Sequence, residues 1–239
     1  MKKIFLLITL FFVSMVGLGQ NRATYYFSKN KSERKFYQPQ DAIKYDVLKV
    51  LAGDLTLAYE RQVGEKSSIE FEIGPTISRF ALNRMNYLGR VAQIPDYNPN
   101  DASSRQSDFG ILASVAYRIY LLNNYPAMNG LYVAPKLKFK NYNDMGNFGD
   151  HVGVSTDDFR NTLNQFFVVF DFGMVHWFSP HFGLEYYTTF GLTMNFFRYH
   201  TYQSSYDEAT DVWTNTYSVK NRRFFNPTLA LGLKLNFGL

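Results

Sequence analysis

The end of the chain carries the clearest pattern of apolar and polar positions. From Pro227 onward, apolar residues alternate with small or polar ones. A period of two residues is that of a β-strand whose two faces meet different surroundings. The alternation runs well past the five or six residues of an ordinary strand and therefore predicts a long strand with one wholly apolar face. The apolar positions are Leu229, Leu231, Leu233, Leu235, Phe237 and Leu239.

The same alternation recurs in six upstream segments: 54–63, 67–79, 108–122, 131–140, 162–178 and 181–198. An eighth strand is expected over 42–52, because closed single-chain bacterial barrels have even numbers of strands. Its alternation is poor, since Val47 and Leu48, like Val50 and Leu51, fall on both faces. A second interpretation joins 45–63 into one strand and takes 24–28 as the first strand.

The connections between these segments alternate strictly between short and long. Residues 63–67, 122–130 and 178–181 form short connections, whereas 79–108, 142–162 and 198–223 form long ones. Short periplasmic turns and long outer loops are typical of outer-membrane barrels. The sequence therefore predicts an all-β protein, an eight-stranded antiparallel transmembrane β-barrel with short periplasmic turns and long extracellular loops.

A soluble lipocalin-like barrel or β-sandwich is the alternative, with the apolar face inside. Alternation by itself does not choose between the two. Three features favour an outward apolar face: the charges share a face with glycine and alanine, the segments are long, and aromatic residues lie near the turns, where interface girdles belong. Examples of these aromatic residues are Tyr59, Trp177 and Phe182.

The first residues predict export. Lys2 and Lys3 precede an apolar stretch with Gly17 and Gly19 at its end. This is the layout of a secretory signal, and the stretch is shorter than the ~20 residues of a membrane-spanning helix. We expect cleavage after Gly19, a signal peptide over 1–19, a flexible periplasmic lead-in over 20–41 and a barrel domain over 42–239.

Composition excludes several kinds of chemistry. The chain has no cysteine, which excludes disulfides, a lipid-modified cysteine and thiolate metal sites. Its 25 Lys and Arg against 20 Asp and Glu give a net charge of +5. The basic residues do not cluster into the face that nucleic acid requires, so no nucleic-acid partner is expected. Aromatic residues make up 18% of the chain although the mean hydropathy is −0.24, which suits strands with one apolar and one polar face.

Two segments resemble the small OmpA-like outer-membrane β-barrel proteins, including barrel domains of unknown function. They are DLTLAYERQVGEKSSIEFEIGP (54–75) and LALGLKLNFGL (229–239). The second also resembles the signal read by the barrel-assembly machinery, with Leu235 and Phe237 as its apolar pair. It departs from that signal by ending two residues beyond Phe237 and by having Ala230 where a polar residue is usual. The resemblance covers about 42–239 and implies a location in the outer membrane of a Gram-negative cell, with outer-membrane lipid and the assembly machinery as partners.

Charged residues on the inward-facing side of the predicted strands are the candidate site. Most lie three to seven residues from a short turn, which places them in one belt roughly 7–16 Å above the turns. Opposite charges in a narrow interior should pair, because an unpaired buried charge is very costly. A salt-bridged plug is favoured over a gate or ion path, because eight strands leave an interior that side chains fill. The candidates are Glu60, Glu70, Glu72, Arg118, Lys136, Lys138, Asp171, Glu185 and Lys234.

Enzymatic chemistry has little support in the sequence. The four histidines lack metal-ligand spacing, and Ser179 and His181 lie together in a short turn without an orienting acid. We therefore expect a non-enzymatic barrel, without cofactor or metal, that serves a structural, surface-interaction or envelope-complex role with a surface or envelope protein as partner. A narrow pore or transporter for small solutes or ions is the alternative, and a lipid-modifying enzyme of the outer membrane comes third.

Overall fold

The computed structural model describes residues 39–77, 104–107, 109–122, 127–147, 160–207 and 211–239. The chain divides into two compact units, Met1–Gln38 and Pro39–Leu239, and only the second contains described residues. The expected signal peptide lies outside the described residues, as does the lead-in up to residue 38. The second unit begins three residues before the expected start of the barrel domain at residue 42.

Strands make up almost all of the described chain, with one short helix. The elements are β1 (Asp41–Asp46), α2 (Val47–Ala52), β2 (Leu57–Gly64), β3 (Ser67–Ile77), β4 (Ser104–Ser107), β5 (Phe109–Tyr120), β6 (Gly130–Asn147), β7 (Arg160–Trp177), β8 (Phe182–Asp207) and β9 (Val212–Gly238).

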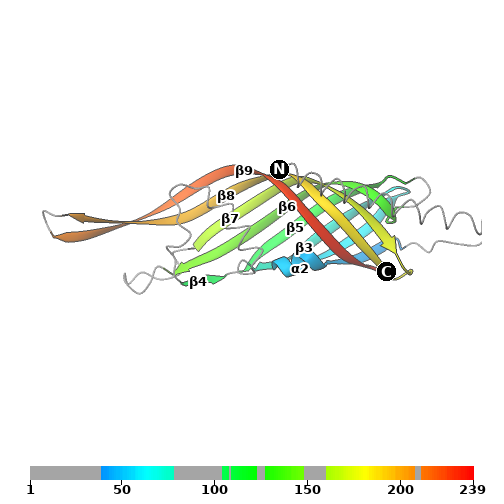
Figure 1. Cartoon of the computed structure of the whole chain (residues 1–239), viewed down its shortest axis with the longest axis horizontal. Coiled ribbons are helices and arrows are strands. Elements are labelled where there is room, and N and C mark those ends of the chain that lie inside the picture. Colours follow the sequence, from blue (N-terminus) through cyan, green and yellow to red (C-terminus); the bar gives the residue numbers. More distant parts are fainter. Residues whose placement is uncertain (1–38, 78–103, 108, 123–126, 148–159, 208–210) are drawn as a thin grey trace, which may run out of the picture. The chain divides into compact units, whose positions relative to one another are not determined.

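Eight of these strands close into a ring. Their order around it is β1, β2, β3, β5, β6, β7, β8 and β9, and β9 pairs back with β1. All pairings are antiparallel, and neighbours around the ring are neighbours among these strands along the chain (Figure 1). The short β4 stands outside the ring and pairs with the end of β6. The all-β, eight-stranded antiparallel prediction is therefore confirmed as a closed ring.

The two faces of the sheet differ as the alternation predicts. Outward-facing Ile73, Val168 and Leu231 are each 61% exposed. Inward-facing Glu60 and Arg118 are fully buried. The interior of the ring is thus the charged face and the exterior the apolar face, the reverse of a lipocalin-like barrel.

The predicted strand 42–52 is wrong in its second half. Its first half is β1, but Val47–Ala52 forms the helix α2. Asp46 caps the start of this helix by accepting a hydrogen bond from the Lys49 backbone N–H, and Gly53 ends it with a left-handed φ of 94°. The poor alternation of this segment reflects that helix. The alternative strand 45–63 is also wrong for this reason, and 24–28 lies outside the described residues.

The predicted long loop 198–223 is wrong as well. The strands β8 and β9 continue through it as a hairpin, with backbone pairing from Tyr199 opposite Lys220 to Asp207 opposite Val212. The pairing of β7 with β8 ends at Thr162 and Arg198, so the hairpin extends past its neighbour (Figure 1). The sequence there lacks the apolar alternation by which the other strands are found. Part of the predicted loop 79–108 is also a strand, β4.

The end of the ring at the short turns is filled by apolar side chains. Ala127 and Met128, from the β5–β6 connection, are fully buried against Tyr120, Tyr132 and other interior residues. The indole N–H of Trp177 donates to the Met128 carbonyl at 2.6 Å, and the Ala127 N–H donates to the Glu65 carbonyl at 2.9 Å. These bonds hold the connection over that end of the ring.

Candidate functional site: charged network inside the ring

The first layer of the interior is formed by six charged residues from six strands. Glu60 on β2 lies directly opposite Glu70 on β3, a like-charge pair that is unfavourable unless cations lie between the two. Across the ring, Glu185 on β8 pairs in register with Lys234 on β9. The alternation of the strands aims all of these side chains inward, because each occupies a buried position of its strand. The six are Lys44, Glu60, Glu70, Arg118, Glu185 and Lys234.

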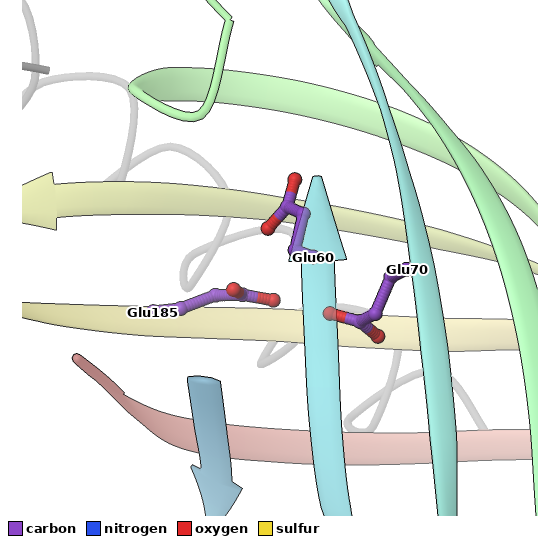
Figure 2. Close-up of side chains that lie close together, drawn as sticks. All are labelled: Glu60, Glu70 and Glu185. Atoms are coloured by element: carbon purple, nitrogen blue, oxygen red, sulfur yellow. The ribbon is translucent and has the colours of Figure 1, made fainter. Parts of the chain in front are cut away.

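Arg118 is the centre of this layer. Its two terminal nitrogens donate to the two carboxylate oxygens of Glu185 at 3.0 and 2.9 Å, a bidentate pair. The same guanidinium also bonds Glu70 and lies 3.5 Å from Glu60. One arginine therefore links three carboxylates. Figure 2 shows these three carboxylates approaching one another from different strands.

Two lysines complete the first layer. Lys234 Nζ donates to both oxygens of Glu70, at 2.7 and 2.9 Å. Lys44 Nζ bonds Glu185 at 2.5 Å and pairs with Glu60. The layer thus contains three carboxylates and three cations, all buried, and carries no net charge.

The three carboxylates also meet a geometric test for metal binding. One oxygen from each of Glu60, Glu70 and Glu185 lies within 4.8 Å of the others. Each carboxylate is already engaged by Arg118 and by at least one lysine. A divalent ion would have to displace these cations, so the residues present favour ion pairing over metal coordination.

A second layer surrounds Glu72. Its carboxylate accepts hydrogen bonds from Lys49 Nζ at 2.5 Å, Thr56 at 2.6 Å and Ser114 at 2.9 Å. Lys136 Nζ lies 3.4 Å from Glu72 and 3.3 Å from Asp171, joining β3 to β7 across the interior. A separate pair, Lys140 and Asp54, is joined at 2.6 Å.

The structure brings eight of the nine predicted residues into ion pairs, and only Lys138 differs. Within the described residues no carboxylate lies at ion-pair distance from Lys138, whose Nζ is 4.8 Å from the centre of the Phe167 ring. Sequence reasoning missed Lys44, Asp46 and Lys49, because the poor alternation of 42–52 gave no inward face to which they could be assigned. Lys140 and Asp54 could have been found from the alternation, since each lies on the inward side of a predicted strand, 131–140 and 54–63 respectively.

Buried tyrosines bind the network from its apolar side. Tyr132 donates to Glu185 at 2.6 Å, and Tyr120 donates to Glu60 at 2.7 Å. Tyr187 donates to Asp46, the capping residue of α2. These hydroxyls supply the acceptor-rich carboxylates with donors that the cations alone do not provide.

Gly232 provides the space for Tyr187. A Cβ atom at this position would lie 2.0 Å from Cζ of the Tyr187 ring. We expect Gly232→Val to lower the free energy of unfolding by about 1–3 kcal/mol, because the tyrosine must move and give up its bond to Asp46. Urea unfolding followed by tryptophan fluorescence measures this. Ala230→Val, on the same face but exposed, is the control, and equal stability of the two variants would contradict the packing described here.

The predicted assembly residues lie at the end of β9. Leu235 pairs with Leu184 and Tyr45 on either side, and Phe237 is 43% exposed with its ring centre 5.9 Å from that of Phe182. Both belong to the outward-facing side of the strand. Their role in assembly stays a prediction.

The weak catalytic candidates have structural roles in the β7–β8 turn. The Ser179 hydroxyl accepts hydrogen bonds from the backbone N–H of His181 at 3.3 Å and of Phe182 at 3.1 Å. It is therefore used to shape the turn. His181 is exposed, and among the described residues no hydrogen bond joins its ring to Ser179.

Among the described residues, no helix is long and apolar enough to cross a membrane. Comparisons with protein-family models, with curated proteins and with solved structures gave no match.

Proposed function

We propose that the ring is a transmembrane β-barrel of the outer membrane, non-enzymatic and closed to solutes, which serves the envelope structurally and through contacts at its long-loop end. The observation that carries this proposal is the inversion of the two faces. Charged side chains fill the interior, whereas leucine, isoleucine, valine and phenylalanine cover the exterior. Lipid is the surrounding that suits such an exterior.

The apolar exterior of the ring would be unfavourable in water. Soluble monomers rarely expose contiguous apolar patches larger than a few hundred Å². Here every ring strand contributes exposed apolar side chains, and stacked or tilted aromatic pairs run across the outside between neighbouring strands. The N-terminal signal-like sequence and the short connections at one end support the same location.

The interior supports a sealed barrel. Its first layer is a neutral set of six buried charges, and Met128 and Ala127 fill the short-turn end beside it. An eight-stranded barrel has an interior just wide enough for side chains. A pore would require an open path through the ion-pair layer and through the apolar side chains at the short-turn end. The proposal therefore favours a structural role over transport.

The β8–β9 hairpin supports a role in surface contact. Beyond Arg198 it is a two-stranded ribbon that extends past β7. Tyr206 and Val219 on this ribbon are exposed. At its tip Tyr206 donates a hydrogen bond to Asp211, which raises the pKa of the tyrosine hydroxyl above its usual value. An exposed ribbon with apolar and aromatic residues is suited to binding a surface or envelope protein.

Ion conductance tests the sealed interior. The mature protein, refolded and inserted into a planar bilayer, should give a closed baseline because the ion-pair layer and the apolar plug occupy the barrel. A trimeric porin measured in the same bilayers shows that insertion and conductance are detectable. Regular single-channel steps from the folded protein would sink the sealed-barrel proposal and favour the transporter alternative.

A further inference from the structure

The wall of the ring is incomplete between β9 and β1. These strands pair only from Lys234 to Gly238 on β9, because β1 ends at Asp46. The longer β9 continues back to Val212. Among the described strands, none pairs with this side of β9 from Phe224 to Leu233.

The backbone of β9 is oriented as that of an edge strand over this stretch. The register with β8 is constant, the Gly238 N–H donates toward β8, and the Leu239 N–H donates toward β1. Odd-numbered residues of β9 therefore direct their backbone groups to the incomplete side. Pro227 is one of them and has no N–H, and proline within a sheet is found on edge strands.

The helix α2 occupies the place that the upper half of β1 would fill. Its backbone lies close to that of β9, and its own backbone bonds are satisfied within the helix. Lys49 reaches inward to Glu72, whereas Leu48 and Leu51 are exposed. Among the described residues, no ladder of hydrogen bonds joins α2 to β9, so the two can part without breaking one.

Lys138 lies on the strand opposite this break. In the eight-stranded ring, β6 is four strands from β1 in either direction. Lys138 is on the inward face of β6 beside Phe167 and has no carboxylate at ion-pair distance in the described chain. On the near side, Ala230 faces inward like the buried Gly232 and Lys234, yet it is exposed. The inward face of β9 is thus more exposed at Ala230, beside the break, than at Gly232 and Lys234, nearer the end of the strand that pairs with β1.

We propose that the break between α2 and β9 admits a single-chain anionic amphiphile from the bilayer, with its head group at Lys138 and its acyl chain passing between α2 and β9. The head group is anionic because, among the described residues, Lys138 has no carboxylate at ion-pair distance, whereas its neighbours Lys136 and Lys140 do. The acyl chain suits the exterior next to the break, where Leu229 and Leu231 are exposed. This inference rests on the proposed transmembrane barrel.

A spin-labelled fatty acid tests it. Stearate labelled near the end of its chain is added to the folded protein in phosphatidylcholine liposomes, and the motionally restricted fraction is measured by electron spin resonance. We expect a restricted component that falls at least severalfold in Lys138→Gln, which removes the head-group partner, and in Ala230→Trp, which fills the break. The matched controls are Arg61→Gln, which removes an exposed cation, and Leu192→Trp, which places a tryptophan on the outward face away from the break.

The methyl ester of the same labelled acid separates charge from apolar affinity. It should show little of the restricted component that the acid shows in the parent protein. Equal restriction of acid and ester, or equal restriction in all four variants, would overturn the inference, because the label would then report only lipid around the barrel. Each sample is first shown to be folded and inserted, so failure of insertion counts against the transmembrane barrel and absence of the restricted component in inserted protein counts against the ligand.

Discussion

Arg118→Leu is expected to lower the free energy of unfolding by about 3–5 kcal/mol, the usual effect of removing one partner from a buried ion pair. Arg118 is fully buried and contacts Glu60, Glu70 and Glu185. Its removal leaves three buried carboxylates with two lysines. Urea unfolding of the protein refolded in an uncharged detergent measures the change.

Two further variants distinguish loss of charge balance from loss of packing. Arg61→Leu removes an arginine that is largely exposed and should leave the stability unchanged. Arg118→Leu combined with Glu185→Leu removes one charge of each sign and should recover part of the loss. The free energy of unfolding that the double variant loses is compared with the sum of the losses in Arg118→Leu and Glu185→Leu. If the two are equal, the residues act independently and the network described here is wrong.

Val168→Arg is expected to lower the stability of the folded protein in a bilayer by about 2–4 kcal/mol, the cost of a cation near the middle of the lipid-facing surface of a barrel. Val168 is on the outward face of β7, and its row includes Leu137 and Leu192 on the neighbouring strands. All three are exposed in the isolated chain. Reversible urea unfolding in liposomes gives the difference.

The position of the substitution provides its own control. Val63 is also outward and exposed, but it lies beside the β2–β3 turn, where an arginine can reach the interface. Val63→Arg should therefore cost about 0–1 kcal/mol. If Val168→Arg is as stable as Val63→Arg, or if both become more soluble without detergent, the exterior faces water and the proposed location is contradicted.

The fold was predictable where one physical constraint acts on every second residue. In β9 from Pro227 onward, and in β3, apolar residues face out and polar residues face in, so the period of two appears in the sequence. The constraint ends where the ring ends. The β8–β9 hairpin beyond Arg198 has no apolar face to reveal it, and α2 is set by its Asp46 cap and Gly53 rather than by alternation.

The candidate site was predictable to the extent that each strand was. Glu60, Glu70, Arg118 and Glu185 were assigned to the inward face from alternation, and the need to pair buried charges implied that they meet. Lys44 and Lys49 lie in the segment where a helix replaces the expected strand, so no face could be assigned to them. Which carboxylate each cation pairs with depends on the register between strands. That register cannot be read from a single sequence.

Heat-modifiability combined with protease protection tests the central claim most directly. The mature protein, refolded into liposomes, is run on a gel with and without boiling, and a second sample is first treated with protease from outside. The account predicts a faster-migrating unboiled band and cleavage confined to the long connections that follow β3 and β6 and to the β8–β9 hairpin. A protein that is soluble without detergent, shows no shift and is cut between the strands throughout would contradict it.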